Sequence, residues 1–211
     1  MGYESGGVDK KNVELGLNLE RRKRPTRFRL DFEYAFETTE PPGQAKETTE
    51  DEFRAFLLGE YDLDRRFFLF ALPAAERDKP RGIKIRTFPS AGIGYRFAES
   101  EKGLLQFQLG LAYVHENFVD FDNNDYMALH IGLEGRYRFG RGIVLAGRTM
   151  YLPSFDGPVD DWLWRTELSL TVPLFDPLSL KFKITEVNDD NPTEDVGDNK
   201  LKTSLLLSAG F

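Results

Sequence analysis

The sequence predicts an all-β fold, an antiparallel up-and-down β-barrel of about twelve strands. Two observations carry this prediction. Apolar residues alternate with polar ones along most segments, and the connections between those segments alternate between short and long. A period of two places successive side chains on opposite faces of a strand. No long window shows a helical period, so residues 1–211 are taken as one β domain.

The alternation is clearest near the middle and the end of the chain. In segment 126–139, His130 and Glu134 lie on one face, whereas Leu129, Ile131 and Leu133 lie on the other. The last segment repeats the pattern with leucines on one face and lysine or serine on the other. The whole pattern predicts eleven full strands, at residues 11–21, 25–37, 50–61, 65–75, 85–98, 103–118, 124–139, 142–152, 161–172, 177–188 and 199–211.

The connections predict where this sheet lies. Short turns are expected at 22–24, 62–64, 99–102, 140–141 and 173–176. Long loops are expected at 6–10, 38–49, 74–84, 116–123, 153–160 and 189–199. Bacterial outer-membrane barrels have short periplasmic turns and longer extracellular loops, so the alternation indicates a transmembrane β-barrel. Strands cross a bilayer without long apolar runs, because only every second residue faces lipid.

The same orientation sets the expected strand number. The connection at 6–10 falls on the side of the long loops, so a strand must enter it from the other side. Single-chain bacterial barrels have even strand numbers. We therefore expect twelve strands in the complete protein, with the first truncated here to its end at 1–5; the alternative is a disordered tail at 1–7.

The polar faces of the strands predict an ionic interior. Charges of both signs must pair or stay hydrated when they are enclosed. A twelve-stranded barrel is wide enough for a narrow aqueous path, and the slight excess of basic residues would favour small anions. The expected lumen-facing charges are Arg27, Arg29, Asp31, Glu33, Arg54, Glu60, Arg96, Glu134, Arg136, Arg138, Arg165, Glu167, Lys181 and Lys183.

Aromatic residues gather near the strand ends, as in the interfacial girdles of membrane barrels. They make up 13% of the chain, which is a high share. The alternative is that they pack the core of a soluble barrel. The expected girdle residues are Phe36, Tyr61, Phe97, Tyr137, Phe139, Tyr151, Trp162, Trp164 and Phe175.

Catalytic and metal-binding patterns are not found. His130 shares its face with Glu134 but lacks the serine partner that nucleophilic catalysis needs, so a hydrogen-bonding role in the lumen is favoured. The acidic stretches 120–125 and 189–198 lack the glycine and final glutamate of a calcium loop. We expect no enzyme activity, no metal and no cofactor. The net charge of −7 argues against nucleic acid as a partner.

Several stretches of the predicted strands, some of them rich in glycine and aromatic residues, resemble a known family. They lie at residues 2–9, 13–19, 91–97, 109–113, 168–171 and 178–181. The family is an uncharacterised outer-membrane β-barrel family described as salt-induced outer-membrane proteins. Residues 6–9 depart from it, because the family usually has Gly-Asn-Thr at the first turn. The resemblance implies the fold and an outer-membrane location, but no reaction.

The C-terminal Phe211 resembles the terminal aromatic residue that the barrel-assembly machinery recognises. The expected partners are therefore this machinery during insertion, the lipid bilayer and lipopolysaccharide. The expected function is a porin-like narrow channel for small solutes or ions, or a structural protein of the Gram-negative cell envelope. The alternative is a soluble, lipocalin-like carrier with its apolar face turned inward, although such carriers usually have eight strands.

Overall fold

A computed structural model gives one antiparallel sheet of thirteen strands. The structure describes residues 9–40, 47–119, 122–157, 161–189 and 199–209. The strands are β1 (Asp9–Lys23), β2 (Thr26–Glu40), β3 (Glu47–Asp62), β4 (Phe67–Leu72), β5 (Ala74–Asp78), β6 (Ile83–Thr87), β7 (Ser90–Glu99), β8 (Gly103–Phe118), β9 (Asn124–Arg138), β10 (Val144–Pro153), β11 (Trp162–Phe175), β12 (Leu178–Asp189) and β13 (Asn199–Ala209). The prediction of an all-β, antiparallel fold is confirmed.

Helical structure in the described part of the chain consists of two short 3₁₀ turns, η1 (Lys79–Arg81) and η2 (Gly140–Gly142). Within these ranges no helix has the length and apolar character needed to cross a membrane.

Two of the traverses across the sheet are broken into two strands each. Strand β3 pairs with both β4 and β5, and β8 pairs with both β6 and β7. The breaks fall at Pro73 and at Phe88–Pro89, where a proline cannot donate to the ladder. The thirteen strands thus make eleven traverses, at the eleven positions predicted. The long loop expected at 74–84 is wrong, because β5, η1 and β6 occupy most of it.

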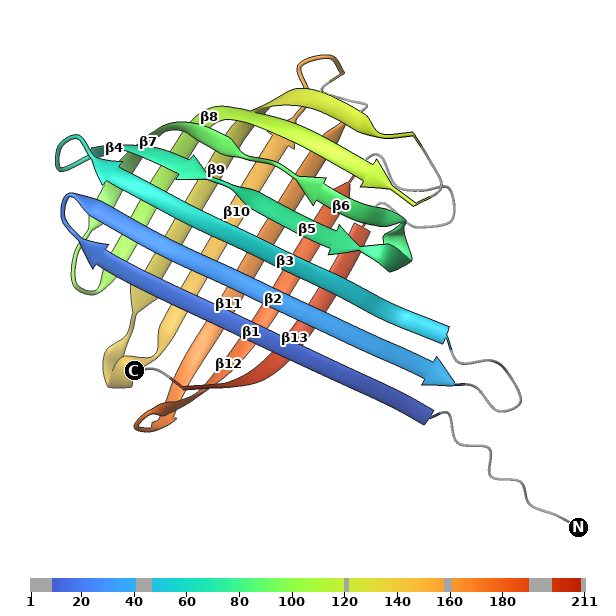
Figure 1. Cartoon of the computed structure of the whole chain (residues 1–211). Coiled ribbons are helices and arrows are strands. Elements are labelled where there is room, and N and C mark those ends of the chain that lie inside the picture. Colours follow the sequence, from blue (N-terminus) through green and yellow to red (C-terminus); the bar gives the residue numbers. More distant parts are fainter. Residues whose placement is uncertain (1–8, 41–46, 120–121, 158–160, 190–198, 210–211) are drawn as a thin grey trace, which may run out of the picture.

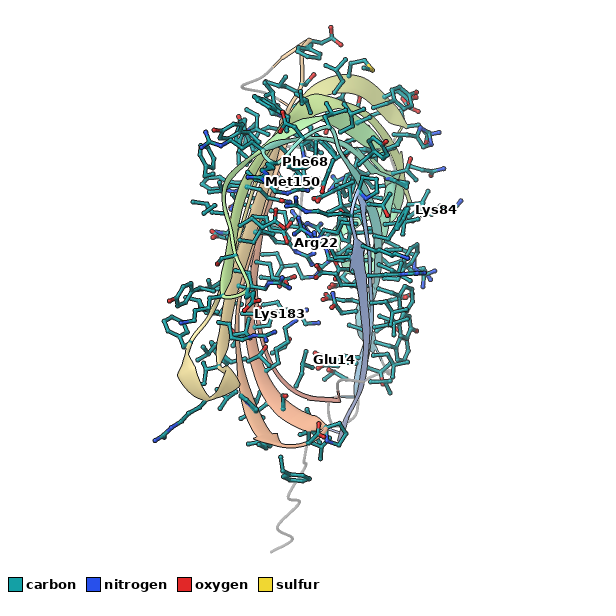
Figure 2. All side chains as sticks on the ribbon, turned by 90° about the vertical axis from the view of Figure 1, so that its left-hand side faces the viewer. Glu14, Arg22, Phe68, Lys84, Met150 and Lys183 are labelled. Atoms are coloured by element: carbon teal, nitrogen blue, oxygen red, sulfur yellow. The ribbon has the colours of Figure 1, made fainter. Side chains whose placement is uncertain are left out.

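The sheet curves until its two halves face each other. Figure 1 shows β1, β2 and β3 crossing in front of β10 to β13. Seen from the end, the sheet forms a flattened ring with two long walls and side chains between them (Figure 2). The strand order begins at β1 and ends at β13. With eleven antiparallel traverses, these two strands run in the same direction.

The connections lie at two ends of the ring. One end carries the tight turns, including Arg24–Pro25 and Asp176–Pro177, as expected. The opposite end carries the β8–β9 and β10–β11 connections. Figure 1 shows the β1–β2 and β3–β4 turns together at its left side. The expected first half-strand at 1–5 lies outside the described residues, as do most of the connections expected at 38–49 and 189–199.

Candidate functional site

Burial in this sheet is inverted with respect to a soluble protein. On β1 the apolar residues face outward, with Leu15 60% and Leu19 55% exposed. On the inner face of β2, Arg27 is 1% and Asp31 6% exposed. Large apolar side chains also remain exposed on all the other long strands, from Leu57 on β3 to Leu205 on β13. The candidate site is therefore the enclosed interior, where the charged groups gather.

The first ionic group, here called the Glu134 cluster, lies toward the tight-turn end. The Glu134 carboxylate accepts hydrogen bonds from Arg27 Nη2 at 2.7 Å and from Arg29 Nη1 at 2.6 Å. Glu60 accepts from Arg96 Nη2 at 3.0 Å and Gln106 Nε2 at 2.7 Å, and it also pairs with Arg27 at 3.3 Å. Since Arg27 and Arg29 are on β2 and Glu134 is on β9, the cluster ties the two walls together.

The second ionic group, the Arg86 cluster, lies toward the opposite end. Arg86 is fully buried and donates to Glu76, Glu116 and Asp189, at 3.1 Å for Glu76 Oε1. Arg165 donates to the other oxygen of Glu76. Asp189 is the last residue of β12, whereas Arg86 is on β6, so this cluster also joins distant strands. Each of the three side-chain nitrogens of Arg86 therefore donates to a different carboxylate, as suits the planar donor set of a guanidinium.

Further pairs cross the interior nearer the sheet edges. Arg148 on β10 donates to Asp31 on β2 and, at 2.9 Å, to Glu167 on β11. The other pairs that reach across are Lys183 with Glu33, Lys200 with Glu52 and Asp78, Arg136 with Glu20, and Lys202 with Glu14. Figure 2 shows Lys183 and Glu14 pointing into the same part of the interior.

An apolar layer separates the two ionic clusters along the middle strands. On β3 the inward residues change from Glu52 and Arg54 to Phe56 and Leu58, and then to Glu60. On β8 the inward residues change from Glu116 to Val114 and Ala112, and then to two glutamines. The buried members of the layer are Leu58, Phe68, Phe70, Leu72, Ala74, Phe88, Ala112, Val114, Tyr126, Ala128, Met150, Leu152, Leu163 and Val187. Figure 2 shows Phe68 and Met150 in the part of the ring away from Lys183 and Glu14.

Small cavities lie beside these clusters. One of about 70 Å³ is lined by His130, Phe56 and Met150 with several ion-pair residues. Another of about 160 Å³ lies toward the tight-turn end and is lined by Asn18, Lys181 and polar neighbours. Both are lined by Arg29, Asp31, Glu134, Arg148 and Glu167, so these ion pairs form a partition between them. Each cavity has room for water.

His130 does not have the role expected for it. It is 1% exposed, and in the described part of the chain neither ring nitrogen has a hydrogen-bond partner. Its ring packs against Phe70, with centroids 5.0 Å apart. The missing side chain of Gly132 leaves room beside it, since a Cβ there would lie 3.0 Å from His130 Nε2 and from Gln108 Oε1. The imidazole therefore lines the smaller cavity without a protein partner for its polar atoms.

Most of the expected interior charges lie where the alternation predicts. Buried or half-buried positions are found for Arg27, Arg29, Asp31, Glu33, Arg54, Glu60, Arg96, Glu134, Arg165, Glu167, Lys181 and Lys183. Arg136 is exposed but still pairs with Glu20 at 3.5 Å. Arg138 is exposed at the end of β9. The expected assembly signal, Phe211, lies outside the described residues.

Sequence reasoning missed several interior residues. Glu76 and Asp189 fall in stretches expected to be loops, and Glu116 lies where the expected strand at 103–118 overlaps the expected loop at 116–123. All three are buried around Arg86. Strict extension of the two-residue period through those stretches could have found Glu116. Arg148 lies in a predicted strand and was overlooked.

The described residues contain no group of three or more His, Asp and Glu side chains placed to hold a metal ion. Of the acidic stretches considered in the sequence, Asp122 and Asn123 are exposed, whereas residues 190–198 lie outside the described part.

Comparison with known proteins adds one match. No curated protein matches the chain. The profile of one protein family matches residues 1–211, which is the whole chain. The chain therefore belongs to the family described as "Protein of unknown function, DUF481".

Proposed function

We propose that this chain is a bacterial outer-membrane β-barrel that serves as a structural envelope protein with a closed interior. The observation that carries the proposal is the inverted burial, with leucine and phenylalanine outside and ion pairs inside. Soluble monomers rarely expose apolar surface on this scale, whereas a lipid-facing barrel requires it. The resemblance to salt-induced outer-membrane proteins supports the same location.

Closure of the ring belongs to this proposal. Strands β1 and β13 run in the same direction, so a closed antiparallel barrel needs one further strand between them. Such a strand would be antiparallel to both neighbours and would bring the number of traverses to twelve, an even number. It would also satisfy the unpaired backbone groups of two edge strands, which lipid cannot do.

The alternative of a soluble carrier is less well supported. A lipocalin-like carrier would place its apolar face inside and its charges outside. Here the inward residues of β2 are charged, and its outward Phe28 is 52% exposed. The apolar layer between the clusters is filled by its own side chains rather than arranged around a large cavity.

Folding conditions test the membrane proposal. The denatured chain is diluted into plain buffer, into detergent micelles and into phospholipid vesicles, and β structure is followed by circular dichroism. We expect folding in micelles and vesicles and aggregation in buffer. A folded, monomeric protein in plain buffer would overturn the proposal in favour of the soluble carrier.

A narrow channel is the second candidate function, and the partition between the two cavities favours it specifically. Both cavities are lined by Arg148 and Glu134, so the breaking of a few ion pairs would join them. Single-channel recording in planar bilayers separates the two functions. We expect the wild-type protein to be silent and the double variant Arg148→Ser with Glu134→Gln to conduct. Steady wild-type conductance would favour the channel, and Lys84→Gln on the outer surface is the matched control.

A further inference from the structure

Basic side chains surround the tight-turn end of the ring. They come from the β1–β2, β3–β4, β7–β8 and β9–β10 turns or the strand ends beside them, which lie far apart in the sequence. The exposed members, here called the basic rim, are Arg21, Lys23, Arg65, Arg66, Lys102, Arg138 and Arg141.

The basic rim finds no acidic partner in the described part of the chain. Among the described residues, no carboxylate forms an ion pair with any of its seven members. The nearby Glu99 is already engaged by Arg22 and, at 2.8 Å, by Arg24. Asp64 accepts hydrogen bonds from two backbone amides of its own turn. A ring of unpaired cations is suited to anionic groups outside the protein.

An aromatic band lies directly beside the basic rim. Arg66 Nη1 donates to Tyr95 Oη at 2.8 Å, and the Tyr95 ring packs against Phe67 and Phe97 with centroids 5.1 Å apart in both pairs. Two strands farther along the sheet, Tyr137 and Phe139 pack together 4.8 Å apart. Such rings mark the level of lipid headgroups in membrane proteins. The basic rim therefore lies where headgroup phosphates would be.

The opposite end differs in charge. Its exposed residues include Asp122, Asp125 and Asp156, and the exposed Lys79 is paired with Asp51 at 2.8 Å. Lys84 at this end is also exposed and unpaired among the described residues, so what distinguishes the tight-turn end is the gathering of seven such cations on one rim.

We propose that the basic rim binds the headgroups of anionic phospholipids in the leaflet at the tight-turn end. This inference rests on the proposed membrane location. Each guanidinium or ammonium group near a charged membrane surface adds attraction that is screened by salt, and arginine can bind a phosphate with two hydrogen bonds. Seven such groups around one rim would hold a shell of anionic lipid against the aromatic band.

The test measures lipid selectivity of the folded protein in vesicles. Spin-labelled phosphatidylglycerol and phosphatidylcholine are compared by electron paramagnetic resonance, which reports the fraction of each lipid held at the protein surface. We expect phosphatidylglycerol to be preferred, and the preference to fall about fivefold for each rim charge removed in Arg65→Gln with Arg138→Gln. The matched control, Lys79→Gln with Lys84→Gln at the opposite end, should keep the preference.

Several outcomes separate the inference from its premise. Equal binding of both lipids by folded protein, or an equal loss of preference in rim and control variants, would overturn the basic rim as a lipid site. Loss of the preference on titration with inorganic phosphate at constant ionic strength would assign the rim to free anions instead. Failure to insert into any vesicle would overturn the membrane proposal itself. If the first rim variant does not fold, Arg21→Gln with Lys23→Gln serves the same purpose.

Discussion

Two neighbouring strands of this sheet, β2 and β3, turn different inner faces to the interior. The inner face of β2 is charged from Arg27 to Glu33, whereas that of β3 has Phe56 and Leu58 between its charged ends. Strand β3 lies beside β4, and their apolar residues belong to one buried layer. The difference teaches that ion pairs hold the interior along β2, whereas packing also contributes along β3 and β4. Buried ion pairs, packed apolar residues and exposed ion pairs should therefore respond differently to substitution.

The largest effect should come from the Arg86 cluster. Arg86→Met leaves three buried carboxylates without their shared cation, and removal of one partner from a buried ion pair typically costs ~3–5 kcal/mol. We expect a lower free energy of unfolding by about this amount in urea titrations of the detergent-folded protein, followed by tryptophan fluorescence. Lys84→Met, an exposed position on the same strand, should change it by ~0.5 kcal/mol or less. Similar losses in both variants would contradict a special role for the cluster.

The apolar layer should come next. Leu152 is fully buried, and its replacement by alanine removes packed methyl groups and leaves a cavity, at a cost of about 3 kcal/mol. Leu168→Ala makes the same chemical change at a side chain that is 47% exposed on the outer face, so no enclosed cavity forms. The same urea titration compares the two, and an equal loss at both positions would mean that the layer adds nothing beyond lipid-facing surface.

The ion pair between Lys183 and Glu33 should have a smaller effect. The Glu33 side chain is 33% exposed, so solvent screens the interaction. A double-mutant cycle with Glu33→Gln and Lys183→Met should give a coupling energy of about 1 kcal/mol. A coupling energy as large as the loss expected for Arg86→Met, ~3–5 kcal/mol, would show that solvent exposure does not weaken this ion pair.

The smallest effect should be found at the sheet edges. Lys202 Nζ on β13 lies 3.4 Å from Glu14 Oε1 on β1, and both side chains are partly exposed. Lys202→Gln should therefore lower stability by no more than ~0.5 kcal/mol, with a difference that disappears at high salt. A large, salt-independent loss would indicate that this pair holds the two edges together.

The strands could be predicted because each one has its own two-residue pattern. The traverses from residue 25 to residue 188 appear where the alternation of residues such as His130 and Ile131 places them. The stretch at 74–84 could not be assigned, since Pro73 and Pro89 interrupt the pattern and resemble loop residues. Its pairing with β3 and β8 depends on strands distant in sequence.

The sequence could not predict which charged side chains pair in the interior, for a related reason. Alternation assigns Glu134 and Arg27 to the inner face of their strands but does not indicate that they meet. Their contact depends on the curvature and flattening of the sheet, which bring β2 opposite β9. The apolar layer was missed because a few apolar residues on an inner face look like breaks in a polar pattern.

The sequence by itself determined the fold class, the positions of the strands and which side chains share a face, because these follow from local periodicity. Only the tertiary structure decided that Arg86 gathers three carboxylates, that Arg148 separates two cavities and that seven basic residues from four turns form one rim. The physical reason is that ion pairing and surface charge depend on distances between strands, and those distances are set by the curvature of the whole sheet.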